Sequence, residues 1–132
     1  MPLIGVGGAI GTIMRFSIES ALPPAANGWP TATFLINISG AFVLAVLLES
    51  LSLHGPDDGW RRRIRLGVGT GVLGGYTTYS SFMVETALLG GNGQYLISFG
   101  YAAMSVVLGL VAAWAGIATV AALHPQGSGA AT

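Results

Sequence analysis

The sequence predicts an all-α membrane protein with four transmembrane helices. The first observation is composition, because 52% of the 132 residues are hydrophobic, only 8% are charged, and the mean hydropathy is +0.71. Ordinary soluble domains contain about 25% charged residues, so this composition suits a surface that faces lipid. The second observation is that the apolar residues form four runs, each long enough for the roughly 20 residues that a helix needs to cross a bilayer. The third is that four of the five arginines gather between two of those runs.

The four runs are separated by residues that favour turns. Pro23 and Pro24 end the first run, and a Gly-Gly-Asn-Gly segment at 90–93 divides the third from the fourth. The N-terminus lacks the basic region and the cleavage site of a secretory signal peptide, so we expect the first run to be retained as a span. The expected spans are 3–22, 32–53, 64–89 and 95–123. A short polar tail follows at 124–132.

The arginines predict how the chain is oriented in the membrane. Arg61, Arg62, Arg63 and Arg65 follow the second span, whereas the loops expected on the opposite side contain no Lys or Arg. Because positively charged loops stay in the cytoplasm, the bias predicts that both termini are cytoplasmic. Four arginines against none also predict one fixed orientation.

The third run has the most unusual pattern. A glycine-rich stretch ends in Gly74 and Gly75, and a cluster of hydroxyl residues follows at 76–81. Adjacent glycines and hydroxyls weaken a helix, and freed backbone groups in a membrane are tolerated only inside protein or beside a cavity. We therefore expect the third helix to be broken near its middle, where its carbonyl groups can face a cation. A seam of small residues for helix packing explains the same pattern about as well.

Several polar and aromatic residues inside the spans are candidates for an ion path. Asn37 places an amide in the second span, and Tyr101 and Ser105 are four residues apart, which places two hydroxyls on one face of the fourth. Tyr79 and Phe82 share a face of the third, and the positive edges of aromatic rings can contact an anion. An interhelical hydrogen bond explains Asn37 equally well, and core packing explains most aromatic pairs at this spacing.

Two charged positions inside the spans also need an explanation. Arg15 lies within the first span, where an unpaired charge costs at least about 2.5 kcal/mol. Glu19 follows four residues later, so we expect the two to pair, either for structure or to draw anions toward a vestibule. Ser81 and Glu85 share another helical face.

Composition excludes several classes of function. There is no cysteine for redox or thiolate chemistry, the net charge of zero makes nucleic acid an unsuitable partner, and no set of nucleophile, base and oxyanion donors can be assembled for an enzyme. A proton-coupled small-molecule exporter is the alternative, and it would need a deep unpaired carboxylate, for which only Glu85 qualifies. An accessory subunit would explain the glycines but would leave Asn37 and the hydroxyls at 77–81 without a purpose.

Three segments of the sequence resemble one family. GGAIGTIMR at 7–15, TFLINISGAF at 33–42 and GGYTTYSSFMVE at 74–85 are similar to motifs of the Fluc or CrcB-type fluoride channels, which are four-span proteins that assemble as antiparallel dimers. The resemblance runs nearly from end to end. It implies a channel in the cell inner membrane that exports cytoplasmic fluoride passively and lowers fluoride toxicity.

The resemblance also implies roles for individual residues. The backbone carbonyls of Gly74 and Thr77 would help to hold a structural sodium ion at the dimer interface, and Arg15 and Glu85 would be vestibule or structural charges. The residues that would line the fluoride path are Asn37, Tyr79, Ser80, Ser81, Phe82, Tyr101 and Ser105.

One departure from the family pattern concerns the pore. Tyr79 stands where the family usually has Phe, and its hydroxyl changes the room and the hydrogen bonding at the anion site. Some members of the family are homodimers that insert in both orientations, whereas others are encoded as pairs with fixed opposite orientations. The arginine bias favours the second kind, so our hypothesis is that this chain is one half of a heterodimer.

Overall fold

The computed structural model describes residues 2–125, and these residues are almost entirely helical. Three long helices are α1 (Pro2–Ala21), α2 (Thr31–Ser52) and α6 (Tyr95–Leu123). Between α2 and α6 runs a third helical stretch, which consists of α3 (Gly59–Ile64), η1 (Arg65–Leu73), α4 (Gly74–Tyr76) and α5 (Tyr79–Gly91). The described residues contain no strand, which confirms the predicted all-α class. Of the predicted tail, 126–132 lies outside the described residues.

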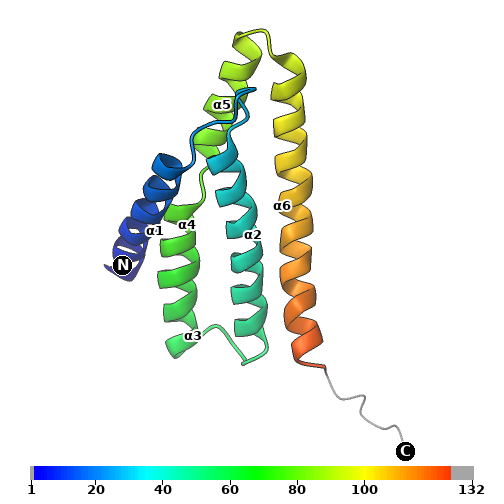
Figure 1. The fold of residues 1–132 in the computed structure, drawn as a ribbon. Coiled ribbons are helices and arrows are strands. Elements are labelled where there is room, and N and C mark those ends of the chain that lie inside the picture. Colours follow the sequence, from blue (N-terminus) through cyan, green and yellow to red (C-terminus); the bar gives the residue numbers. More distant parts are fainter. Residues whose placement is uncertain (1, 126–132) are drawn as a thin grey trace, which may run out of the picture.

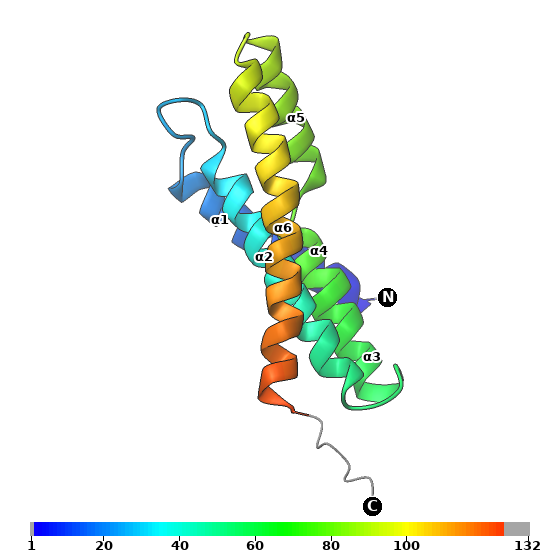
Figure 2. The same cartoon turned by 90° about the vertical axis from the view of Figure 1, so that its right-hand side faces the viewer.

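Successive helical stretches run back and forth between the two ends of the molecule. Figure 1 shows α2 between the third stretch and α6, with α1 leaning against the other side of η1 and α4. The loop at 53–58 and the last turn of α6 lie at one end, and the α5–α6 connection lies at the other. In Figure 2, α5 runs beside α6 at that second end, whereas α3 lies at the first. This alternation is the one expected of four consecutive membrane passes.

The surface of the helices is apolar. α2 and α6 are long and apolar enough to cross a membrane, whereas α1 has two charged residues and the third stretch is divided into shorter segments. Many large apolar side chains are exposed, among them Phe16 at 69%, Leu96 at 86% and Trp114 at 70%. Soluble monomers rarely expose apolar patches of this extent, so these faces suit contact with lipid or with another subunit.

Glycines allow α1 to lie directly against the backbone of the third stretch. Gly7 and Gly11 are buried, and a Cβ atom at Gly11 would collide with the carbonyl oxygen of Val72. A Cβ atom at Gly7 would likewise collide with the carbonyl of Gly67. In a bilayer the hydrophobic effect does not drive helices together. Close van der Waals contact of this kind is therefore what favours their association. The packing role expected for the small residues is therefore confirmed at this contact.

The arginine cluster lies on a helix, whereas we expected it in a loop before a span starting at residue 64. α3 begins at Gly59, so the arginines at 61–63 lie in its last turn. Arg61 pairs with Asp58 at 2.6 Å and Arg65 pairs with Asp57 at 2.6 Å, and Arg61 also donates to the carbonyl of Pro56. These contacts tie the loop to the helix and let the helix start early.

The hydrogen bond from Arg65 lowers the pKa of the Asp57 carboxyl below its usual value. The ion pair between Asp57 and Arg65 therefore persists in the neutral range.

The glycine contact predicts a difference between two alanine substitutions in α1. We expect Gly11→Ala to destabilise the protein by about 1–3 kcal/mol, because the added methyl group meets backbone atoms of η1 and α4 that cannot move aside. Gly5 has open space around its Cβ position, so Gly5→Ala should leave stability unchanged or raise it slightly through helix propensity. Thermal unfolding in detergent measures both, and equal melting temperatures for the two variants would contradict the packing described.

Candidate functional site

The candidate site surrounds an interruption of the third helical stretch. α4 ends at Tyr76 and α5 begins at Tyr79, and the two residues between them have extended backbone angles. Thr77 has φ −76° and ψ 156°, and Thr78 has φ −144° and ψ 123°. Regular helical hydrogen bonding cannot continue through this conformation, so the backbone groups around it need other partners.

Asn37 of α2 supplies those partners for Thr78. The Asn37 side-chain amide donates to the Thr78 carbonyl oxygen at 2.9 Å, and the Thr78 backbone N–H donates to Asn37 Oδ1 at 2.8 Å. One planar amide therefore satisfies both backbone groups of a residue that has left the helix. Leaving two such groups unpaired would cost about 1–3 kcal/mol each. The interhelical bond considered for Asn37 is thus present, and we call this pair of hydrogen bonds the Asn37–Thr78 clamp.

The interruption frees two carbonyl groups. In an α-helix the Gly74 carbonyl would accept from the N–H of Thr78, but that N–H donates to Asn37. The Thr77 carbonyl would accept from Ser81, whose N–H donates instead to Thr78 Oγ1 at 3.1 Å in an N-terminal cap of α5. Both carbonyls therefore lose their regular donors. They belong to the two residues that the resemblance assigns to a cation.

Gly74 and Thr77 also line one recess of about 280 Å³, which we call the Gly74 recess. Asn37 and Gly40 of α2 contribute to its opposite wall. A Cβ atom at Gly40 would collide with the Thr77 methyl group, so this glycine lets α2 approach the interruption. The described residues contain no group of three or more His, Cys, Asp or Glu that could hold a metal ion.

Aromatic rings and hydroxyls gather on the α5 side of the interruption. The rings of Phe82 and Tyr101 are 5.3 Å apart between centroids, and Tyr101 is completely buried. Tyr79 lies 6.2 Å from Phe82 but is 76% exposed, so its ring points away from the interior of the chain. A second recess of about 240 Å³, the Phe82 recess, is lined by Asn37, Thr77, Thr78, Tyr79 and Phe82.

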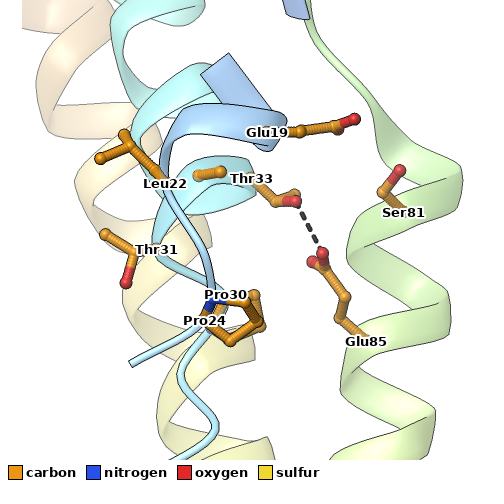
Figure 3. Close-up of a pocket in the computed structure, with 9 residues that line it drawn as sticks. Glu19, Leu22, Pro24, Pro30, Thr31, Thr33, Ser81 and Glu85 are labelled. Atoms are coloured by element: carbon orange, nitrogen blue, oxygen red, sulfur yellow. Dashed lines mark hydrogen bonds between the residues drawn. The ribbon is translucent and has the colours of Figure 1, made fainter. Parts of the chain in front are cut away.

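Glu85 is held between two helices by hydroxyl groups. Thr33 Oγ1 donates to one carboxylate oxygen at 2.7 Å, and the Tyr101 hydroxyl donates to the other at 2.8 Å. Figure 3 shows the Thr33 bond at the edge of a recess of about 270 Å³, the Glu85 recess, where the Ser81 hydroxyl and the Glu19 side chain lie near the carboxylate. Glu85 is therefore fixed in place by residues of α2 and α6.

Glu19 does not pair with Arg15, so that expectation was wrong. Within residues 2–125 no ion pair joins the two, and the Glu19 side chain instead lines the Glu85 recess. Figure 3 shows it directed toward the start of α5 and Ser81. The physical reason is that α1 ends over this recess, so the Glu19 carboxylate can face its polar lining instead of Arg15.

The remaining predicted residues lie at different depths. Ser80 is exposed, and its hydroxyl lies 3.3 Å from that of Thr78. Ser105 is one turn below Tyr101 on α6, and its hydroxyl oxygen is buried with no hydrogen-bond partner among the described residues. Buried hydroxyls are normally paired, so Ser105 has hydrogen-bonding capacity that the described residues do not use.

Sequence reasoning did not single out three residues that organise the site. Thr33 holds Glu85, Thr78 caps α5 and receives the clamp, and Trp29 packs edge-on against Tyr101 at 5.6 Å. The spacing offered one clue, because Thr33 and Asn37 are four residues apart and so present two polar groups on one face of α2.

Comparisons with known proteins place these residues in a family context. The family described as "CrcB-like protein, Camphor Resistance (CrcB)" matches residues 2–117 of the chain. The fluoride-specific ion channel FluC 1 of Cutibacterium acnes is 48% identical over 118 residues, which cover 89% of this chain and 82% of the relative. FluC 2 of Leifsonia xyli is 50% identical over 123 residues, covering 93% and 84%, and FluC of Caulobacter vibrioides is 40% identical over 116 residues, covering 87% and 90%.

The clamp predicts how fast the Thr78 amide exchanges with solvent. In Asn37→Ala the Thr78 N–H loses its acceptor, so we expect its hydrogen exchange to be roughly 10- to 100-fold faster, as a loss of about 1–3 kcal/mol implies. Ser39→Ala is the matched control, since Ser39 bonds Tyr76 and Ile36 but not Thr78. NMR-detected exchange in a membrane mimetic measures both variants. Unchanged exchange at Thr78 in Asn37→Ala would show that the clamp does not protect it.

Proposed function

This chain belongs to the CrcB-like protein family, and from this premise we propose that it forms a fluoride-selective channel that exports cytoplasmic fluoride passively. The resemblance predicted from its three motifs is thereby confirmed, and with its apolar helices α2 and α6 the chain is a membrane protein. Three relatives that are 40–50% identical over most of both chains are named as fluoride-specific ion channels, which supports the same activity here.

The observation that carries the proposal is the interrupted third stretch beside uncharged donors. Fluoride that leaves water needs hydrogen-bond donors, but a full positive charge beside it would trap it. The Asn37 amide has a second N–H hydrogen besides the one that holds Thr78, and the hydroxyls of Ser80 and Ser81 lie on the next turn. The ring edges of Phe82 add a weak positive field. These groups favour a small anion without binding it too tightly to leave.

The fluoride path that we propose continues along α6. Tyr101 already gives its hydroxyl hydrogen to Glu85, so it offers fluoride its ring, which packs against Phe82. Ser105 supports the next step, because its buried hydroxyl has no partner among the described residues. Arg15 lies in α1 without an ion pair among the described residues and can raise the local anion concentration in a vestibule.

Passive conduction is sufficient for export. Hydrogen fluoride is a weak neutral acid that crosses bilayers and ionises in the cytoplasm, where fluoride then accumulates. A membrane potential of 100 mV, negative inside, favours outward movement of one anion by about 2.3 kcal/mol. A selective pore thus lowers fluoride toxicity without a coupled proton or nucleotide.

We further propose that a sodium ion sits at the interruption, held in part by the carbonyls of Gly74 and Thr77. The fit is supported by the loss of their regular helical donors and by their shared position on the Gly74 recess. Hard cations prefer oxygen ligands, and two carbonyls from one chain leave coordination positions for a second subunit. When bound, the cation supplies a fixed positive charge that stabilises the broken helix.

The active unit that we propose is an antiparallel dimer, formed with either a second copy or a paired homologue. Tyr79 supports a partner at this face, because its side chain is 76% exposed and its polar hydroxyl would be costly to leave against acyl chains. The arginines at 61–65 favour one orientation, with both termini in the cytoplasm and the chain in the inner membrane. Two relatives carry the numbers 1 and 2 in their names, which is compatible with a paired arrangement.

The alternative of a proton-coupled exporter is less well supported. It needs a carboxylate that is free to exchange protons with a substrate, and Glu85 was the candidate. Both oxygens of Glu85 accept hydrogen bonds, from Thr33 and Tyr101, so it is held as part of a network. A fixed carboxylate of this kind suits a structural or path-shaping role.

Fluoride efflux from liposomes tests the proposed activity. With the partner present, we expect fluoride to leave at least about 100-fold faster than chloride, a difference of about 2.7 kcal/mol in barrier height. Ser105→Ala should slow fluoride about tenfold through loss of one donor, whereas Ser17→Ala, on an exposed face of α1, should not. Equal fluoride and chloride rates would contradict the proposal. Fast efflux from the purified chain alone would exclude an obligate heterodimer.

Removal of sodium tests the cation site separately. When choline replaces sodium at equal ionic strength, we expect a lower melting temperature, because a ligand that binds only the folded state stabilises it. Asn37→Ala should weaken this sodium dependence, because without the clamp the Thr78 backbone loses the hydrogen bonds that hold it extended, and the Gly74 and Thr77 carbonyls are no longer fixed in place. A melting temperature that does not depend on sodium would speak against a bound ion, whatever the efflux result.

A further inference from the structure

The arginine-rich turn of α3 contains two kinds of arginine. Arg61 and Arg65 are bound to Asp58 and Asp57, and the side chain of Arg61 is only 17% exposed. Arg61 also donates to the Pro56 carbonyl at 2.7 Å, so its guanidinium holds the loop together. These two arginines and the two aspartates cancel in charge. They have a structural task that leaves them little capacity for another ligand.

Arg62 and Arg63 have no such task. Both are exposed, and neither forms an ion pair within the part of the chain that the structure describes. They are adjacent in sequence on α3, so two full positive charges remain on one turn after the internal pairs are counted. Two exposed guanidinium groups on one turn create a local positive field that attracts an anionic partner.

Trp60 locates this charge relative to the membrane. Its ring is 54% exposed, and it is held between His54, at 6.3 Å edge-on, and the guanidinium carbon of Arg61, at 5.7 Å. Tryptophan prefers the boundary between acyl chains and headgroups, because one part of the ring is apolar and the N–H needs a polar partner. Arg62 and Arg63, on the same turn, therefore lie at the level of lipid phosphates.

We propose that Arg62 and Arg63, anchored by Trp60, bind the phosphate groups of anionic lipids, and we call this surface the Arg62–Arg63 patch. A guanidinium group presents two parallel N–H donors that match two phosphate oxygens. Basic residues beside a bilayer are attracted to an anionic surface by about 1 kcal/mol each. Zwitterionic lipids carry a compensating ammonium group, so they satisfy this patch less well.

A second copy of the chain offers a poorer counter-charge than lipid does. The sequence has five acidic residues, of which Asp57 and Asp58 are paired with arginine and Glu85 is bonded to Thr33 and Tyr101. The other two, Glu19 and Glu49, are partly buried and line separate recesses. Asp57 and Asp58 form an exposed acidic pair, but each already balances an arginine of its own chain, and residues 2–125 contain no second exposed acidic pair that could meet two arginines at once. Lipid phosphate remains the suitable partner.

The proximity of Trp60 provides a direct test. Brominated lipids quench tryptophan fluorescence on contact, so the purified full-length protein is titrated in micelles with brominated phosphatidylglycerol and brominated phosphatidylcholine. Trp60→Phe, measured in parallel, identifies the part of the quenching that comes from Trp60. We expect the anionic lipid to be preferred on the order of tenfold at this site. Equal quenching of Trp60 by the two lipids would overturn the proposal.

Two paired variants separate charge from fold. Arg62→Gln with Arg63→Gln should abolish the preference, whereas Arg62→Lys with Arg63→Lys should keep most of it, because charge is retained and only the paired donors are lost. Retention of the full preference in the glutamine variant would also contradict the proposal. If the glutamine variant does not fold, the lipid titration is repeated on the unaltered protein with about 0.5 M salt. An electrostatic preference for the anionic lipid should then fall severalfold. Persistence of the preference in salt would exclude the Arg62–Arg63 patch as its source.

Discussion

The two hydrogen bonds between the Asn37 side chain and the Thr78 backbone are the constraint on which the rest of the site depends. An extended residue inside a membrane helix is costly, because its N–H and carbonyl groups have no water to turn to. The Asn37 amide is a neutral side-chain group that both donates and accepts in a single plane, so it can replace the two lost bonds at once. This exchange makes the interruption stable without introducing charge.

The other features of the site follow from the interruption. Once the Thr78 N–H is taken by Asn37, the Gly74 carbonyl has lost its helical donor, and once Thr78 Oγ1 caps Ser81, the Thr77 carbonyl has lost its own. The same break resets the direction of α5, which brings Phe82 against Tyr101 and Glu85 between its two hydroxyl donors. Carbonyls without their helical donors on one side and uncharged donors on the other are what our proposal of a cation beside an anion path requires.

Glycine packing determines how the two halves of the third stretch are supported. α1 lies against η1 and α4 through Gly7 and Gly11, so the segment before the interruption is backed by another backbone. The segment after it is tied to α6, where the Ser98 hydroxyl donates to the Thr86 carbonyl at 2.7 Å. The interruption thus lies between two well-packed segments, and the chain direction can change there without loosening either one.

Local patterns in the sequence predicted the helices and the region of the candidate site, but not its contacts. The apolar runs and the turn residues located α1, α2 and α6 to within one residue, because span length and proline or glycine breaks are local properties. The pairing of Asn37 with Thr78 spans 41 positions, and that of Thr33 with Glu85 spans 52, so neither can be derived from spacing on one helix. The rule that oppositely charged residues four apart on a helix pair with each other predicted an Arg15–Glu19 ion pair. That prediction failed, because Glu19 lies over a polar recess formed by other helices.

The most direct measurement of the central claim is an experimental structure of the protein in a lipid bilayer with sodium and fluoride present. We expect Thr78 to remain extended and paired with Asn37, with sodium density beside the carbonyls of Gly74 and Thr77. An unbroken helix in which the Thr78 N–H donates to Gly74, with the hydroxyls of α5 facing lipid, would contradict it.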